Sequence, residues 1–326
     1  MSTQTIRAGA IQLHAEVGNV GTNLERIEKL VNEAAKKGAK IIGIPEFCTS
    51  KLPFDTKAHQ AVLPIDNPAL ALFVKLAKQH NCWLGGSMLI ADSGEVYNRY
   101  FFVEPDGTIH EHDKDLPTMW ENCFYAPGND DGVFNTGLGG VGAAVCWELI
   151  RNQTLKRMAN RVNFAITGTH WWTVPYNWGS LVGKSLASIA QYNRYLSENA
   201  PAEFARRLGV PVIQASHCGP FRTNFLLVPG TNLSLPYDTE YVGATQIVDA
   251  HGRVLAQRRT QEGPGVVVAD ISLTPITPIE SIANRFWVPE LPLFLHAYWH
   301  QQNICAKSYY RRLGRNRGLE AAAKYR

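Results

Sequence analysis

Short apolar runs alternate along the chain with longer segments whose apolar residues recur at helical spacing. Residues 8–13 and 41–44 are continuous apolar runs, and each predicts a buried strand. Between them, apolar residues recur every three or four positions from 24 to 34, which predicts a helix. Asn23 is the expected cap of that helix, and Gly38 marks its end.

The alternation continues through the first half of the chain. The pair Asn67-Pro68 predicts a helix start, because proline is favoured at the first helical position. A strand is expected over 82–90. Residues 96–103 and 108–112 flank the turn residues Pro105-Asp106-Gly107, so we expect a hairpin there.

The second half repeats the scheme. A strand over 141–145 precedes a helix from about Asn152, and a strand over 163–167 precedes a helical pattern over 178–208 that Pro201 should interrupt. The remaining expected strands are 211–215, 224–228, 243–249, 253–257 and 266–271, with a hairpin turn at 250–252.

Alternating strands and helices with interspersed hairpins predict an α/β fold with mixed sheets. No linker interrupts residues 5–275, so we expect one domain there. Residues 276–326 form a C-terminal extension of different composition, aromatic and proline-rich at first and basic at its end. We expect this extension to be solvated or to contact another subunit.

Composition excludes several classes of protein. The net charge of +4 does not call for nucleic acid or an anionic membrane. No apolar run is long enough to span a bilayer, and the N-terminus does not resemble a secretory signal, so we expect a cytoplasmic protein. The six cysteines are scattered without a C-x-x-C pair, which argues against a metal cluster or a disulfide scaffold.

Three residues combine reactive chemistry with a suitable position. Glu46 follows the strand 41–44, where ligands of α/β sheets gather, although most loop glutamates are simply solvated. Lys114 follows a hairpin strand and, taken alone, reads as a surface lysine. Cys146 ends an apolar strand before a helix, whose N–H groups should lower the pKa of the thiol; a buried structural cysteine is the more common alternative.

Taken together, these stretches resemble the nitrilase superfamily of carbon–nitrogen hydrolases, which use a Glu–Lys–Cys triad in this order. The resemblance covers about residues 5–275. It rests on the following matches: Ile44-Pro45-Glu46-Phe47, Lys114-Asp115-Leu116-Pro117-Thr118, Glu121, Val145-Cys146-Trp147-Glu148, and residues 243–249 with Gly252. One departure is the absence of a proline shortly after Cys146.

The resemblance implies a four-layer αββα sandwich that dimerises or assembles further through the helices that follow Cys146 and Trp178. It also implies the roles of the matched residues. Glu46 would be the base, Cys146 the nucleophile, and Glu121 would orient Lys114 or the substrate. Lys114 and the N–H of Trp147 would stabilise the charge on oxygen. No metal or organic cofactor is required.

The implied substrate is a small molecule, and its identity stays open. We expect hydrolysis of a small amide or carbamoyl compound, with nitrile hydrolysis as the alternative that Cys-Trp-Glu favours. Beside Trp147, the residues His170, Trp171 and Trp172 could bind the substrate, as could Tyr176 and Trp178, or they could pack in the core. A soluble acyltransferase and a scaffold without activity are the rival classes.

Overall fold

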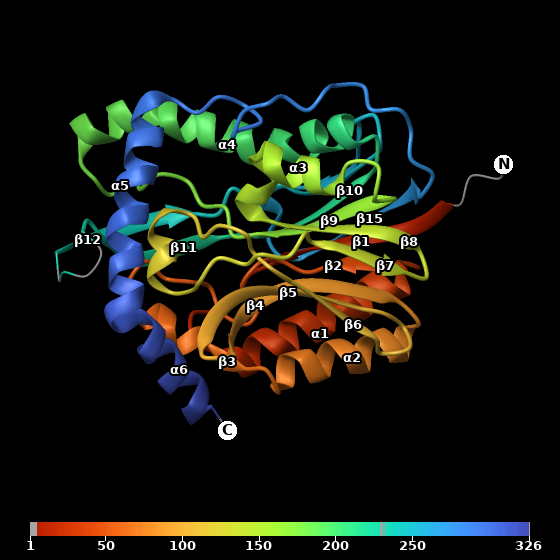
Figure 1. The fold of residues 1–326 in the computed structure, drawn as a ribbon, viewed down its shortest axis with the longest axis horizontal. Coiled ribbons are helices and arrows are strands. Elements are labelled where there is room, and N and C mark those ends of the chain that lie inside the picture. Colours follow the sequence, from red (N-terminus) through yellow and green to blue (C-terminus); the bar gives the residue numbers. More distant parts are fainter. Residues whose placement is uncertain (1–4, 229–230, 232, 326) are drawn as a thin grey trace.

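A computed structural model describes residues 5–325, apart from residues 229, 230 and 232, as two layers of strands between two layers of helices (Figure 1). Helices α1 (Val20–Lys36) and α2 (Pro68–His80) cover one face. Helices α3 (Asn152–Met158) and α4 (Ser180–Leu208) cover the opposite face. This arrangement confirms the αββα sandwich.

The first layer of strands is mixed. Its strands β1, β2 and β4 run parallel, β5 pairs antiparallel with β6 as the predicted hairpin, and β5 also pairs antiparallel with β4, which was not predicted. In spatial order the strands are β6 (Ile109–Asp113), β5 (Glu95–Val103), β4 (Trp83–Asp92), β2 (Ile41–Gly43), β1 (Thr5–Leu13) and β15 (Gly265–Ser272), with β3 (Leu63–Pro64) beside β4.

The second layer repeats this plan, with β8, β9 and β10 parallel. In spatial order it contains β7 (Val133–Thr136), β8 (Gly139–Val145), β9 (Phe164–Thr169), β10 (Val212–His217), β13 (Thr245–Val248) and β14 (Val254–Arg258). A separate ribbon is formed by β11 (Pro220–Leu226) and β12 (Ser234–Glu240). Strands β7 and β12 were not predicted from the sequence.

The two layers meet at the carboxyl ends of their central strands. There β1 pairs with β10 only through Gln12–Ser216 and Leu13–His217. Because ligands of such sheets bind beyond the carboxyl ends of parallel strands, residues that follow β2, β8 and β9 are brought to one place.

Two apolar clusters hold the layers together. One lies between α1, α2 and the first layer, where Ile27, Val31, Ile42, Phe73 and Leu84 are fully buried. The other fills the space around the second layer and beneath α4. Burial of each large side chain contributes about 1.5–3 kcal/mol to stability before chain entropy is counted.

Helix α1 begins earlier than expected, so the assignment of Asn23 as its cap was wrong. The cap is Asn19, whose side chain accepts the backbone N–H of Thr22 at 3.2 Å. Asn23 is buried inside the helix, and its amide donates to the backbone oxygens of Glu16 and Thr49 at 2.8 and 2.9 Å. It therefore ties the helix to the loop after β2 instead of starting the helix.

Helix α4 runs through Pro201, although an interruption was expected there. The proline removes one backbone donor, but Ala200, Phe204 and Ala205 around it are buried against the sheet. Tertiary packing of this face keeps the helix continuous. The segment after Cys146 also differs in detail, because a 3-10 turn, η3 (Cys146–Ile150), precedes α3.

The C-terminal extension folds back on the domain. Val288 N–H donates to the carbonyl of Ile150 at 2.9 Å, and Asn152 donates through its side chain to the carbonyl of Trp287. Beyond these contacts come α5 (Leu293–Tyr309), a π turn η5 (Tyr310–Gly314) and α6 (Arg315–Lys324). The hydroxyl of Tyr310 donates to Glu95 at 2.6 Å and so anchors the end of the extension on β5.

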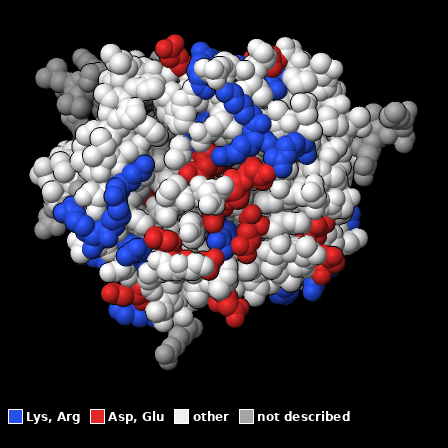
Figure 2. Space-filling view, viewed as in Figure 1, with Lys and Arg blue, Asp and Glu red and all other residues white. Residues whose placement is uncertain are grey.

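On the face seen in Figure 2, Lys and Arg side chains gather in separate groups, and Asp and Glu side chains lie beside them. Within the basic end of the chain, Arg315 pairs with Glu95 at 3.3 Å and Arg317 donates to Tyr309. None of the helices in the described parts of the chain is both long and apolar enough to cross a membrane.

Candidate active site

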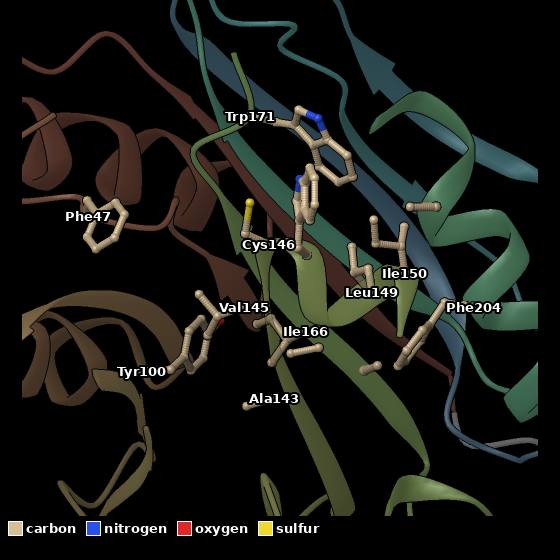
Figure 3. Packing of buried hydrophobic residues seen from close by; sticks show 14 of the residues in the cluster. Phe47, Tyr100, Ala143, Val145, Cys146, Leu149, Ile150, Ile166, Trp171 and Phe204 are labelled. Atoms are coloured by element: carbon tan, nitrogen blue, oxygen red, sulfur yellow. The ribbon is translucent and has the colours of Figure 1, made fainter. Parts of the chain in front are cut away.

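The three predicted catalytic residues come from loops that follow different strands. Glu46 lies after β2, Lys114 directly after β6, and Cys146 directly after β8. Glu46 and Lys114 are fully buried and Cys146 is 4% exposed, so the interpretations of a solvated glutamate and a surface lysine were wrong. Figure 3 shows Cys146 where β8 gives way to η3, with Phe47 on one side and Trp171 nearby.

The backbone at this site is conformationally strained. Cys146 has a φ of 54°, Phe47 a φ of 50° and Met119 a φ of 52°, values that residues with a Cβ rarely adopt. Gly168 in β9 lies so close to the Glu46 loop that a Cβ there would stand 2.7 Å from the carbonyl carbon of Pro45. Such strain clusters at functional sites, where packing holds side chains in fixed positions.

Lys114 bridges two carboxylates. Its Nζ lies 2.9 Å from Oε1 of Glu46 and 2.8 Å from Oε2 of Glu121. The same Glu121 oxygen accepts the backbone N–H of Thr118 at 2.8 Å and the hydroxyl of Tyr125. Glu121 is thus fixed on the lysine, which is one of the two arrangements that the resemblance implied.

Glu46 keeps its carboxylate aligned through three donors. Besides Lys114, Asn98 donates to Oε1 at 2.9 Å and the backbone N–H of His170 donates to Oε2 at 2.9 Å. Burial raises the pKa of Glu46 to about 7, while the charge of Lys114 opposes that rise. A carboxyl group with a pKa near neutrality can both take and return a proton.

The pKa of Cys146 differs from the sequence-based expectation. Burial, and next the charge of Glu46, raise the pKa of the thiol well above its usual value, and Lys114 opposes this. The expectation that helix N–H groups lower this pKa was wrong, because the buried site strongly disfavours a thiolate beside a carboxylate. The resting residue is a thiol, so a base must remove its proton as the sulfur attacks.

The side chain of Lys114 keeps its positive charge in the buried site. Burial alone would lower the pKa of Lys114, but the charges of Glu121 and Glu46 outweigh it and hold the pKa well above its usual value. The backbone N–H of Trp147 lies in the first turn of η3, where helical N–H groups have no partner within the helix. These two groups flank Cys146 and can receive a developing oxyanion.

Glu148 was part of the matched motif, but its position was not predicted. It is fully buried, and one of its carboxylate oxygens accepts from Val145 N–H at 2.6 Å and from His112 Nε2 at 2.9 Å. The other accepts from the N–H of Asp115 at 2.9 Å. Glu148 therefore links the turn before the nucleophile to the turn after the lysine.

A cavity of about 370 Å³ opens onto Cys146. The predicted substrate-binding residues Trp147, His170, Trp171 and Trp172 all line it, as does Trp178. Tyr176 is 63% exposed and does not line it. Sequence reasoning missed the contribution of α5, whose residues Phe294, Leu295 and Tyr298 form part of the wall.

Two buried histidines beside the site, His170 and His217, are neutral. The N–H of Leu52 and the hydroxyl of Tyr241 both meet Nε2 of His170, at 3.1 and 2.6 Å, so its ring proton sits on Nδ1. Burial lowers the pKa of His170 well below its usual value. His217 is also buried, and its Nε2 donates to the carbonyl oxygen of Glu46 at 2.6 Å.

Among the described residues, no three His, Cys, Asp or Glu side chains come together in a way that could hold a metal ion. The described cysteines are all free thiols, and of these only Cys146 lines the cavity.

Comparison with known proteins identifies the family. The family model described as Carbon-nitrogen hydrolase matches residues 7–280. The chain belongs to the carbon–nitrogen hydrolase family, and the sequence resemblance is confirmed at this level. The matched segment ends before α5.

Two individual relatives share low sequence identity with the chain, over less than half of its length. The chain is 26% identical to Nitrilase 3 of Arabidopsis thaliana over 167 residues, covering 45% of this chain and 48% of the relative. It is 33% identical to Omega-amidase NIT2-B of Xenopus laevis over 151 residues, covering 43% of this chain and 54% of the relative. The chain thus spans about half the length of these relatives.

A solved structure supports the fold. The carbon–nitrogen hydrolase from Helicobacter pylori G27 superposes with a TM-score of 0.67 at 20% identity, covering 83% of this chain and 90% of that one. At this identity the likeness concerns the fold alone.

Proposed function

We propose that the protein hydrolyses a non-peptide carbon–nitrogen bond of a small amide or carbamoyl compound through a thioester on Cys146. The observation that carries the proposal is the buried contact of Lys114 with Glu46 and Glu121 beside Cys146, at the base of a cavity. Membership of the family supports it.

The first half of the reaction forms the thioester. Glu46 takes the thiol proton as Cys146 Sγ attacks the carbonyl carbon, and the charge that develops on oxygen is stabilised by Lys114 and the N–H of Trp147. The carbon–nitrogen bond then breaks, and Glu46 gives the proton to the departing amine or ammonia. Glu46 ends this half as a carboxylate.

The second half releases the acid. Glu46 takes a proton from water, and the resulting hydroxide attacks the thioester carbonyl. The carbon–sulfur bond breaks, the sulfur recovers the proton from Glu46, and a carboxylic acid leaves. In this cycle Lys114 keeps its charge, because its contacts with Glu121 and Glu46 stabilise the ammonium form.

Hydrolysis of a nitrile is the second candidate. Attack of Cys146 on a nitrile carbon forms a thioimidate, and water then converts it to the thioester with release of ammonia. The similarity to Nitrilase 3 and the Cys-Trp-Glu sequence favour this candidate.

The test is ammonia release from pairs of amides and nitriles that share one acyl group, together with carbamoyl compounds, for the wild type and Cys146→Ala. We expect release that depends on Cys146, and the faster member of each pair decides between amidase and nitrilase. Transfer to an added hydroxylamine in preference to water would indicate an acyltransferase. No turnover and no binding of any compound would favour a scaffold protein.

A further inference from the structure

The wall of the cavity is almost entirely apolar. Above Cys146 it is built from aromatic and aliphatic side chains that come from six separate segments of the chain, among them Trp120, Trp172, Trp178, Phe225, Tyr237 and Leu295. Glu121 is the one acidic residue among the described lining residues, and its Oε2 already accepts a hydrogen bond from Lys114.

Most of the hydrogen-bonding groups on the tryptophans and tyrosines described below are bonded within the protein, although Thr118 Oγ1 and His170 Nδ1 in the lining are buried without a partner. Trp171 Nε1 donates to Asn193 at 2.7 Å, and Trp178 Nε1 donates to the carbonyl of Pro236 at 2.8 Å. The hydroxyls of Tyr192 and Tyr237 donate to backbone carbonyls at 2.8 and 3.1 Å. What these side chains present to the cavity is therefore their ring surface.

A negatively charged substrate tail would meet no counter-ion among the lining residues that the structure describes. The lining residues that the structure describes include no Lys or Arg side chain. Burying a carboxylate without a partner is strongly unfavourable, whereas an aromatic ring can pack against the surrounding rings. A volume of about 370 Å³ is at the small end of the range of ligand pockets, which fits one ring system on a short linker.

Helix α5 completes the wall from outside the segment that the family model matches. The chain passes over α4 and then descends as α5 beside the β11–β12 ribbon (Figure 1). Phe294, Leu295 and Tyr298 face the cavity from the first turns of α5, while the neighbouring Leu293 is 87% exposed and does not line it. The ring of Tyr298 lies 6.4 Å from that of Phe225.

We propose that the cavity selects an uncharged acyl group that ends in an aromatic ring, and that Phe294, Leu295 and Tyr298 of α5 are specificity-determining residues for that ring. This inference rests on the proposed function, since it names the acyl group that Cys146 would receive.

The test compares 4-phenylbutanamide with glutaramate, the same chain with a carboxylate in place of the ring, and with pentanamide. The corresponding nitriles run in parallel. Burial of the ring predicts a kcat/KM for 4-phenylbutanamide, or for its nitrile, about 10- to 200-fold above that for pentanamide. Glutaramate should be the poorest of the three. Equal or faster hydrolysis of glutaramate would overturn the proposal.

A charge on α5 tests the role of that helix. Phe294 is 49% exposed, so Phe294→Arg can fold, and it should reduce the preference for phenyl over carboxylate at least about tenfold. Leu293→Arg is the matched control and should leave the preference unchanged. Equal effects of the two variants would exclude α5 from substrate selection.

Binding separates this proposal from the proposed function. Tryptophan fluorescence of Cys146→Ala should report saturable binding of 4-phenylbutanamide and none of glutaramate. If the wild type hydrolyses nothing but this binding is seen, the reaction is wrong and the assignment of the apolar ligand stands. If hydrolysis depends on Cys146 but the binding preference is absent, the substrate class is wrong.

Discussion

At the residue scale, chemistry at this site depends on how burial and charge act on Glu46 and Cys146. The carboxyl group of Glu46 has a pKa of about 7, because burial raises it and Lys114 limits the rise. The thiol of Cys146 stays protonated at neutral pH. In the proposed reaction, proton transfer from Cys146 to Glu46 is therefore the first step.

The pKa of Glu46 predicts how kcat/KM depends on pH. Glu46 acts as a base only when ionised, so kcat/KM for a neutral amide should rise about tenfold per pH unit below about 7 and level off above it. Initial rates from pH 5 to 9 measure this profile. A flat profile between pH 5.5 and 8.5 would contradict the role of Glu46 as the base.

At the element scale, much of the fold follows from local patterns. The apolar runs that precede Glu46 and Cys146 predicted β2 and β8, and Asn67-Pro68 predicted α2, because these signals are local in sequence. Helix α4 could not be predicted through Pro201, since tertiary packing overrides the local penalty. The contacts of Glu148 with His112 and Asp115, and the wall formed by α5, depend on segments far apart in the chain, which no single-sequence pattern reports.

Strand β9 lies close to the loop that holds Glu46, so a larger residue at Gly168 should displace Glu46. In Gly168→Ala the new Cβ would meet backbone atoms of Pro45 and Glu46, which cannot move aside like a flexible side chain. Displacement of Glu46 should lower kcat about 100-fold. Gly21→Ala is the control, because nothing lies within 4 Å of its Cβ and it replaces a helical glycine. Unchanged kcat in Gly168→Ala would show that this contact does not position Glu46.

The buried charges around Glu148 predict a pH-dependent stability. Burial alone would lower the pKa of His112, but Glu148 and Asp130 outweigh it and raise the pKa to about 10. The folded protein then holds a proton that the unfolded chain releases above about pH 6.5. The stability that His112 contributes is thus complete below about 6.5 and is lost as the pH rises toward about 10.

Urea unfolding from pH 6 to 9.5 tests this link. The free energy of unfolding of the wild type should fall across that range more steeply than that of His112→Gln. At pH 6.5 the variant should be less stable by about 3 kcal/mol, because it leaves Glu148 buried without its cation. Parallel pH profiles for both proteins would contradict a charged His112.

At the scale of the whole molecule, the extension after residue 275 closes the cavity and also leaves apolar surface uncovered. Leu293 and Ile304 on α5 are 87% and 71% exposed, and Tyr195 on α4 is 50% exposed. Where such side chains join into one apolar patch, they mark a surface that binds a partner. These residues support the expectation that subunits assemble through the helical layer and the extension.

We predict a homodimer or a larger homo-oligomer in solution. Multi-angle light scattering at micromolar concentration should give a mass of at least twice 36.2 kDa. Ile304→Glu on α5, with Val17→Glu as a control on a distant exposed loop, should lower the mass if the extension takes part. A single species at 36.2 kDa for the wild type would contradict the prediction of an oligomer.

In the proposed reaction, Cys146 carries the acyl group of the substrate as a thioester. The most direct measurement is intact-protein mass spectrometry after rapid acid quenching of the wild type with an amide or nitrile that it turns over, followed by peptide mapping. We expect an added mass equal to the acyl group, located on Cys146 and absent in Cys146→Ala. Turnover that persists in Cys146→Ala without an adduct would contradict it.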